Sequence, residues 1–230
     1  MTRRSRGWGA GTCGDPVSHG EQSKAVASRT VAIHQPNVFP WLGYLDKIRR
    51  VEEFVFFDNV SAPQGKSWVS RVQVLRDGSP IWLTMPIRRA SGQLISEVRL
   101  SEPVAASWRK LLGTVEHAYA KAPFAEEVLA WMGASAPEEG TLLADFNIAA
   151  IQGLSRRLGI TDVRFSRASE AADLAGSSSR QTARIVETCQ AFGATTYVSG
   201  LGCLDFLEPE LFAEAGVQLE FQHFLHPVYP

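Results

Sequence analysis

The sequence predicts an α/β fold: a mostly parallel, Rossmann-like sheet with flanking helices and a small antiparallel β excursion. Short β-type runs alternate with helical stretches from position 30 onward, which is typical of a parallel sheet covered on both faces. The run 54–57 is apolar throughout, as expected of a strand buried on both sides. Only the segment 68–87 departs from this alternation and resembles paired antiparallel strands.

The composition favours one large domain with a substantial core. The chain has 230 residues, is 45% hydrophobic and contains 6 Trp and 12 Phe. Its formal net charge of -1 provides no global field that would attract nucleic acid or an anionic membrane. No apolar run approaches the roughly 20 residues of a membrane helix. We therefore expect neither nucleic acid nor a membrane as a partner.

The cysteines and the N-terminus indicate a cytoplasmic protein. Cys13, Cys189 and Cys203 are odd in number and lack a Cys-x-x-Cys spacing, so neither a disulfide framework nor a zinc site is expected. Cys189 is predicted to be a core residue, and Cys203 is a weak candidate nucleophile. Residues 1–28 are rich in Gly, Ser and Arg and predict a disordered tail without a secretory signal, so the α/β domain spans 29–230.

The first unit along the chain is predicted to be strand, loop, helix, strand. Residues 30–33 form a β-type run that Pro36 interrupts. Apolar residues then recur at helical spacing over 40–50, with Pro40 in the first helical turn. The strand at 54–57 follows, and Asp58-Asn59 ends it. A parallel βαβ unit fits this order.

The remaining elements are a hairpin followed by helices and strands. The hairpin surrounds Asp77-Gly78-Ser79-Pro80, which indicates a loop longer than a two-residue turn, and 94–100 predicts a third short strand. Ser178-x-x-Gln181 has the form of a capping box that opens a helix. The other expected elements are helices over 104–119, 143–158, 178–192 and 208–215, and strands over 163–165, 195–198 and 217–221.

The segment His34-Gln35-Pro36-Asn37 is the main candidate site, because it joins a predicted parallel strand to a predicted helix. Ligands of open α/β sheets bind at the carboxyl ends of strands, where helix N-termini offer free N–H groups. Asp58 and Asn59 end the next strand and should lie at the same edge. The sequence therefore predicts one pocket containing His34, Asn37 and Asp58. A hydrogen-bonded turn with a structural histidine is the alternative.

Further side chains are expected to bind substrate around this pocket. Arg71 could bind a phosphate or carboxylate in bidentate fashion, or be a solvated strand residue. Ser199-Gly200 follows a strand and could form an anion-binding nest, or a plain turn. His226 could instead be a terminal packing residue. The full set of expected substrate-binding residues is Gln35, Trp41, Tyr44, Lys47, Asn59, Arg71, Ser199, Gly200 and His226, with no metal ligands.

The chain resembles the WbqC-like protein family over about residues 30–230. The opening signature is Ala32-Ile33-His34-Gln35-Pro36-Asn37, Phe39-Pro40-Trp41-Leu42-Gly43-Tyr44, Asp46-Lys47-Ile48 and Phe54-Val55-Phe56-Phe57-Asp58-Asn59-Val60. Later motifs are Ser70-Arg71-Val72, Trp82-Leu83-Thr84-Met85-Pro86-Ile87, Tyr119-Ala120-Lys121-Ala122-Pro123-Phe124, Tyr197-Val198-Ser199-Gly200 and His226-Pro227-Val228-Tyr229-Pro230.

This resemblance implies a biosynthetic enzyme of surface-polysaccharide or specialised-metabolite pathways that acts on a sugar or amino-acyl substrate. The family usually has a second acidic residue at the position of Asn59, so metal dependence is not expected. Family members also run on beyond the final His226-Pro227-Val228-Tyr229-Pro230, which suggests a truncated reading frame.

Three functions stay open from the sequence. The first is acyl or amino-acyl transfer to an amino-sugar or related amine, with His34 as general base, Asn37 stabilising negative charge and Asp58 orienting the base or the substrate. The second is a nucleotide-dependent transferase or ligase, by analogy with nucleotidyltransferase folds. The third is a non-catalytic binding protein of a biosynthetic complex. The substrate would be a small sugar, amino-acyl or nucleotide-linked molecule, a biosynthetic carrier protein is a conceivable partner, and the residues specify no cofactor.

Overall fold

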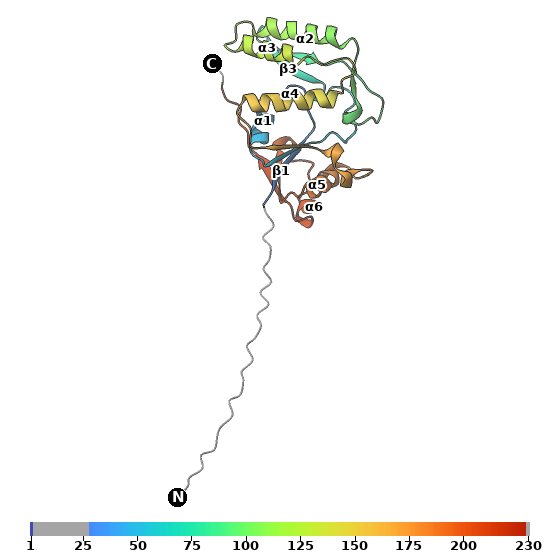
Figure 1. Cartoon of the computed structure of the whole chain (residues 1–230), viewed down its shortest axis with the longest axis vertical. Helices are drawn as coiled ribbons and strands as arrows, with labels where there is room; N and C mark the ends of the chain where they lie inside the picture. The colour runs from blue at the N-terminus through green and yellow to red at the C-terminus, as the bar shows by residue number, and fades with distance from the viewer. Residues whose placement is uncertain (2–27, 229–230) are drawn as a thin grey trace.

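A five-stranded sheet organises the computed structural model, which describes Met1 and residues 28–228 (Figure 1). The tail expected at 1–28 lies outside these residues apart from its two ends. The sheet has the order β7-β2-β1-β8-β9, and every neighbouring pair is parallel. Its strands are β1 (Thr30–His34), β2 (Glu53–Phe56), β7 (Arg164–Arg167), β8 (Thr196–Gly200) and β9 (Gln218–Gln222). The predicted α/β, Rossmann-like class is confirmed.

Helices cover both faces of this sheet, which explains why its central strands are apolar throughout. On one face, Ala32, Phe54 and Phe56 pack with α1 (Leu42–Arg49) and α4 (Leu143–Arg157). On the other face, Val31, Ile33 and Val55 pack with α5 (Gln181–Ala191) and α6 (Pro209–Glu214). Side chains alternate across a strand, so two apolar faces require an unbroken apolar run.

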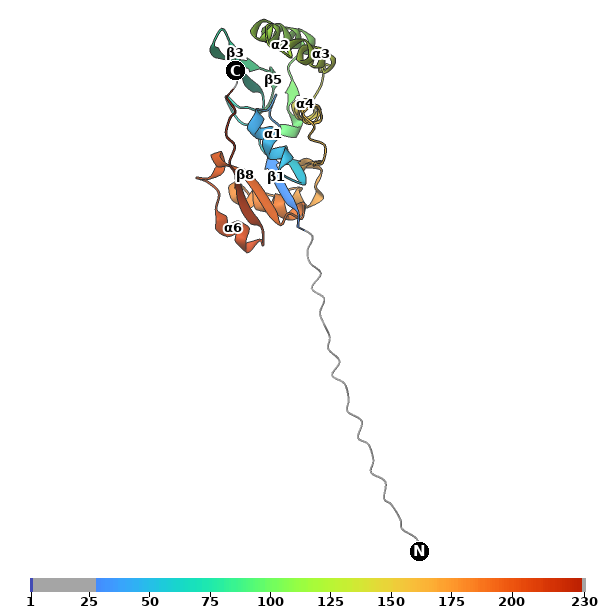
Figure 2. The same ribbon diagram turned by 90° about the vertical axis from the view of Figure 1, so that its left-hand side faces the viewer.

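A long insertion between β2 and β7 builds a second core above α4 (Figure 2). Leu143, Ala144 and Phe146 of α4 belong to that core, whereas Ile148 and Ile151 pack against the sheet, so α4 serves both. The insertion contains β3 (Arg71–Arg76), β4 (Ser79–Thr84), β5 (Ile87–Arg88), η1 (Ile95–Glu97), β6 (Arg99–Leu100), α2 (Val104–Tyr119) and α3 (Ala125–Ala134). Short 3-10 turns follow β7 and β8: η2 (Ala168–Glu170), η3 (Ala172–Leu174) and η4 (Leu201–Cys203). Within the described chain, no helix has the length and apolarity to cross a membrane.

The structure corrects several predicted details. The β3–β4 hairpin closes through a two-residue turn, because Arg76 pairs with Ser79 and both Asp77 and Gly78 have positive φ (51° and 73°). Helix α1 begins at Leu42, so Pro40 precedes it rather than occupying its first turn.

Two further elements differ from what the sequence predicts. Within the strand expected at 94–100, Arg99–Leu100 pairs with β5 and Leu94 forms only an isolated bridge with Ser61, because a 3-10 turn occupies Ile95–Glu97. Helix α3 was not predicted, because its apolar residues form no long stripe and only Met132 is buried.

The strand order creates a topological switch point between β1 and β8. The chain runs from β1 outward through β2 to β7, then returns to the other side of β1 with β8 and β9. Connections therefore leave the carboxyl ends of β1 and β8 in opposite directions, and a crevice opens between them. Ligands of doubly wound α/β proteins bind at such a crevice.

Candidate functional site

A cavity of about 850 Å³ opens at the carboxyl edge of the sheet, on the face that α5 covers. One wall follows the ends of β1 and β2 through His34, Gln35 and Asn59. The opposite wall is the segment 177–181 at the start of α5. Apolar side chains, including Tyr197 and Phe206, complete the lining. This combination of apolar walls with a few convergent polar groups is typical of a small-molecule site.

His34 ends β1 at the rim of this cavity, and its neutral imidazole packs against Trp41 and Tyr44. Its Nδ1 lies 3.0 Å from the Gln35 carbonyl oxygen. A carbonyl only accepts hydrogen bonds, so the neutral ring carries its proton on Nδ1 and keeps a lone pair on Nε2. Burial, reinforced by the nearby Lys47 cation and opposed by the hydrogen bond to Gln35, lowers the pKa of His34 to about 3. The ring is therefore uncharged at neutral pH.

The start of α5 faces the cavity with free backbone donors and a cluster of hydroxyl groups. The N-cap residue Arg180 makes no side-chain cap, so the first N–H groups of this 11-residue helix lack side-chain partners. Ser177 and Ser179 donate hydrogen bonds to the Glu187 carboxylate, which fixes the loop against its own helix. These hydrogen bonds lower the pKa of Glu187. The predicted capping box at Ser178-x-x-Gln181 is wrong, because the helix begins at Gln181 and that residue has a φ of 52°.

Lys47 approaches the same edge from α1, on the other face of the sheet. Only 4% of this residue is exposed, and its Nζ lies 3.9 Å from the position a Cβ would take on Gly200 at the end of β8. Burial lowers the pKa of Lys47 to about 8, while the Cys203 thiol opposes this effect. Lys47 itself is not among the residues that line the cavity.

The chain matches a known protein family. The profile of the WbqC-like protein family matches residues 35–230, which is most of the chain. The chain belongs to the WbqC-like family. It is also similar to a protein of Mycobacterium tuberculosis (strain ATCC 25618 / H37Rv) named Uncharacterized protein Rv1507c, with 28% identity over 194 residues, which cover 83% of this chain and 80% of the relative. No solved structure matches it.

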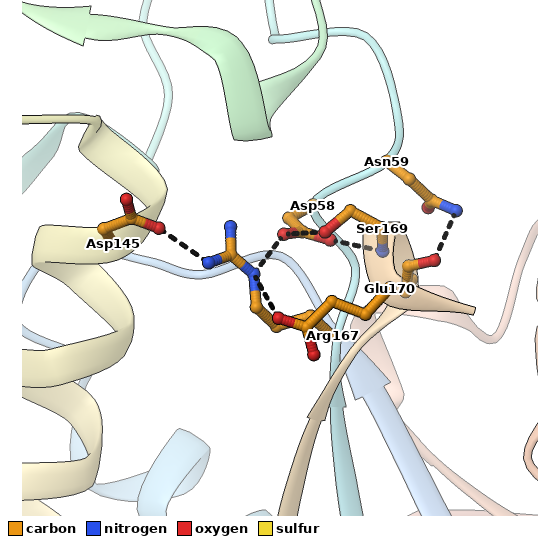
Figure 3. Close-up of polar contacts among 7 residues, drawn as sticks. Asp58, Asn59, Asp145, Arg167, Ser169 and Glu170 are labelled. Carbon is orange, nitrogen blue, oxygen red and sulfur yellow. Dashed lines mark hydrogen bonds and ion pairs between the residues drawn. The ribbon is translucent and has the colours of Figure 1, made fainter. Parts of the chain in front are cut away.

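The site of this WbqC-like chain differs from the predicted one at Asp58. That carboxylate is completely buried, and Figure 3 shows it turned toward Arg167 and Ser169. Arg167 Nε donates to it at 2.8 Å, and the Ser169 backbone N–H and hydroxyl donate at 2.9 and 2.8 Å. Asp58 makes no hydrogen bond to His34 and does not line the cavity. The Asp58 carboxylate therefore has a structural role, because it joins the end of β2 to the end of β7.

Asn37, Trp41 and Tyr44 lie in or near the loop after β1 and do not line the cavity. Asn37 is 4% exposed and is not among the cavity-lining residues. Tyr44 is fully buried, donates a hydrogen bond to the Gln35 carbonyl at 3.1 Å and packs edge-on to His34. Trp41 remains 39% exposed, with its ring 5.9 Å from that of His34. Asn147 of α4 anchors the same loop by donating to the Pro36 carbonyl at 2.8 Å.

The other expected substrate-binding residues divide between the switch point and more distant positions. Ser199 is fully buried within β8, and Gly200 ends that strand beside Lys47. Arg71 lies on the β3–β4 hairpin with its guanidinium 3.8 Å from the centre of the Trp82 ring, outside the cavity lining. His226 is exposed, with its ring 4.9 Å from that of Phe224.

Asn59 occupies the position where the family resemblance implied an acidic residue. Its Nδ2 donates to the Ala168 carbonyl at 3.1 Å, and its buried Oδ1 has no hydrogen-bond partner. Across the described residues, no group of three or more His, Cys, Asp or Glu side chains could hold a metal ion.

Sequence reasoning missed the wall of the cavity that α5 provides. The signal was the run Ser177-Ser178-Ser179-Arg180, which was interpreted only as a helix cap. Arg180 is exposed at the cavity, and Arg184 is buried there with its Nη2 donating to the Leu174 carbonyl. The sequence could not place this run beside His34, because that depends on β8 lying next to β1.

Proposed function

We propose that the protein is a biosynthetic group-transfer enzyme, and specifically a nucleotide-dependent transferase or ligase. Its phosphate-bearing donor, a nucleotide or a nucleotide-linked sugar or acyl group, would occupy the switch-point cavity. The observation that supports this is the convergence of the uncapped α5 N-terminus, the serine loop and Arg180 on a cavity that also holds His34. Helix N-termini and their free N–H groups favour phosphate.

A second observation points to an anionic ligand independently of the helix. Lys47 brings a cation to the end of β8, where its Nζ lies 3.9 Å from the position that a Cβ would take on Gly200. The apolar part of the lining, including Ile185 and Phe206, suits the base or the organic part of such a donor. His34 Nε2 is then the acceptor for a proton or hydroxyl group of the reacting partner.

The pathway and location follow from the family as further parts of this proposal. Transfer of an acyl or amino-acyl group to an amino-sugar, in surface-polysaccharide or specialised-metabolite synthesis, fits a small donor cavity beside an imidazole. Cys189 and Cys203 are both free thiols, which fits a reducing cytoplasm. A biosynthetic carrier protein could present the acceptor.

Ligand-induced stabilisation tests the nucleotide part of the proposal. ATP, UTP and nucleotide sugars are added to the full chain, and the melting temperature is measured. A bound nucleotide at a hundredfold excess over its dissociation constant should stabilise the fold by about 2.7 kcal/mol. Arg180→Ala should reduce that shift, whereas Arg109→Ala, on the exposed surface of α2, should leave it unchanged.

The outcomes separate the nucleotide-dependent function from the other two that the sequence leaves open. If no nucleotide raises the melting temperature, the proposal of a nucleotide-dependent enzyme is wrong. Acyl transfer without a nucleotide and a non-catalytic binding role then remain. A shift that Arg180→Ala and Arg109→Ala reduce equally would show that the nucleotide binds elsewhere.

A further inference from the structure

Three tryptophans form a row of exposed rings outside the cavity. Trp41 precedes α1, Trp68 precedes β3 and Trp82 lies in β4, and these residues are 39%, 43% and 40% exposed. The ring centroids of Trp41 and Trp68 are 6.0 Å apart, and those of Trp68 and Trp82 are 5.0 Å apart. Single exposed apolar side chains are common, whereas contiguous ones mark binding surfaces. We call these three residues the tryptophan row.

Buried contacts hold the tryptophan row in place. Asn147 of α4 is fully buried and donates hydrogen bonds to the Pro36 carbonyl at 2.8 Å and to the Val69 carbonyl at 2.7 Å. The loops that carry the first two tryptophans are thereby joined to one helix. A Cβ on Gly43 would lie 2.8 Å from Trp41 Nε1, so a larger residue at this position would displace the ring. A row that is already ordered loses little conformational freedom when it binds a ligand.

The two ends of the row carry polar groups. At one end, the Arg71 guanidinium carbon lies 3.8 Å from the centre of the Trp82 ring, which is a cation–π contact. The buried Nε of Arg71 has no hydrogen-bond partner among the described residues. At the other end, the Trp41 ring lies 5.9 Å from the ring of His34, at the rim of the switch-point cavity. An unpaired donor beside exposed indoles favours a ligand that carries oxygen acceptors.

The size and chemistry of the row favour a saccharide. Three rings of this exposure offer roughly 300 Å² of surface, whereas each partner of a stable protein complex buries about 800 Å². Single-stranded nucleic acid also stacks on aromatic rings, but it requires a basic groove, and the formal net charge of this chain is -1. A sugar presents polarised C–H groups to the negative faces of the indoles. Its hydroxyl oxygens accept hydrogen bonds from guanidinium and indole N–H groups.

We propose that the tryptophan row is a platform that binds a saccharide by stacking, with Arg71 donating to the oxygens of the sugar. The inference deepens the proposed function, because the row ends beside His34 and the bound saccharide would be the acceptor of the transferred group. That assignment as acceptor rests on the proposed function, whereas saccharide binding by the row does not.

An array of neutral, N-acetylated and uronic-acid oligosaccharides, probed with the fluorescently labelled full chain, tests the proposal. The saccharide that gives the strongest signal is then titrated by calorimetry. Trp68→Leu keeps an apolar side chain but removes the aromatic face, and it should weaken binding by about tenfold or more. Trp68→Phe should retain most of the affinity. Phe124→Ala removes a ring that is 71% exposed at the start of α3, and it should bind like the wild type.

The outcomes decide between the saccharide and other occupants of the row. If no oligosaccharide binds, or if Trp68→Leu binds as tightly as the wild type, the platform assignment is wrong. A wild-type dimer that Trp68→Leu dissociates, measured by analytical ultracentrifugation, would show that a second copy of the chain covers the row. Trp82→Leu provides the same comparison if a lowered melting temperature shows that Trp68→Leu folds poorly.

Failure of this inference can be distinguished from failure of the proposed function. Trp68 does not line the switch-point cavity, so Trp68→Leu should keep the nucleotide-induced shift in melting temperature. Loss of saccharide binding with an intact nucleotide shift would remove only the platform. Saccharide binding without any nucleotide shift would remove only the nucleotide-dependent function.

Discussion

At the scale of single residues, burial and the nearby Lys47 cation keep the His34 imidazole neutral. Burial and the Lys47 cation both lower the pKa of His34, to about 3. General-base catalysis is most efficient when the pKa lies near the working pH, so His34 in the free protein is a weak base.

The depressed pKa of His34 predicts a pH-dependent loss of stability. The unfolded chain protonates this histidine near pH 6.5, whereas the folded chain does so only near pH 3. Since the unfolded state binds more protons between these values, acidification below pH 6.5 favours unfolding. Between pH 7 and pH 5, the free energy of unfolding of His34→Gln should fall by up to about 2 kcal/mol less than that of the wild type. Urea denaturation at both pH values measures this difference. His223, an exposed histidine, provides the control as His223→Gln, which should retain the wild-type sensitivity.

At the scale of elements, Arg167 connects three segments that are far apart in the sequence (Figure 3). From the end of β7 it donates to Asp58 after β2 at 2.8 Å and to Asp145 of α4 at 2.6 Å. The carboxyl edge of the sheet is thereby attached to the helix that carries the inserted core. Asp58 thus joins the ends of β2 and β7, which differs from the predicted role beside His34.

Removal of the Asp58 carboxylate should therefore affect stability more than ligand affinity. Asp58→Ala leaves Arg167 without its buried partner, and we expect the free energy of unfolding to fall by about 3 kcal/mol. Asp145→Asn, whose side chain is 47% exposed, should cost at most about 1 kcal/mol. Both values come from urea denaturation. An Asp58→Ala protein with wild-type stability that no longer binds ligand would instead support the catalytic role.

Sequence reasoning identified elements well but not their lateral order. The apolar run at 54–57 and the alternation that follows predicted the parallel sheet, because both depend on local periodicity. Periodicity does not tell which strand lies beside β1, and the cavity depends on β8 lying there. His34 and Gln35 were therefore found by their place at a strand end, whereas Ser179 and Arg180 were missed.

At the scale of the whole molecule, the sheet and the insertion share α4 and are expected to unfold together. Leu143 and Phe146 pack into the inserted core, and Ile148 and Ile151 pack against the sheet. A single rigid helix cannot leave one core without exposing part of the other. Loss of the insertion alone would expose apolar surface of α4, which makes a half-folded state unfavourable.

Coincident unfolding transitions would verify this coupling. Trp68, Trp82, Trp108 and Trp131 all lie in the insertion, so tryptophan fluorescence reports mainly on that part of the chain, including its core at the buried Trp108. Far-ultraviolet circular dichroism reports on the helices of both parts. In urea the two signals should give one midpoint, as for a two-state domain. Ile151→Ala, in the part of α4 that faces the sheet, should lower both midpoints equally, with a loss of about 2–5 kcal/mol in the free energy of unfolding. A fluorescence midpoint that stays at its wild-type value in this variant would show that the insertion is held without the sheet, and that α4 does not couple them.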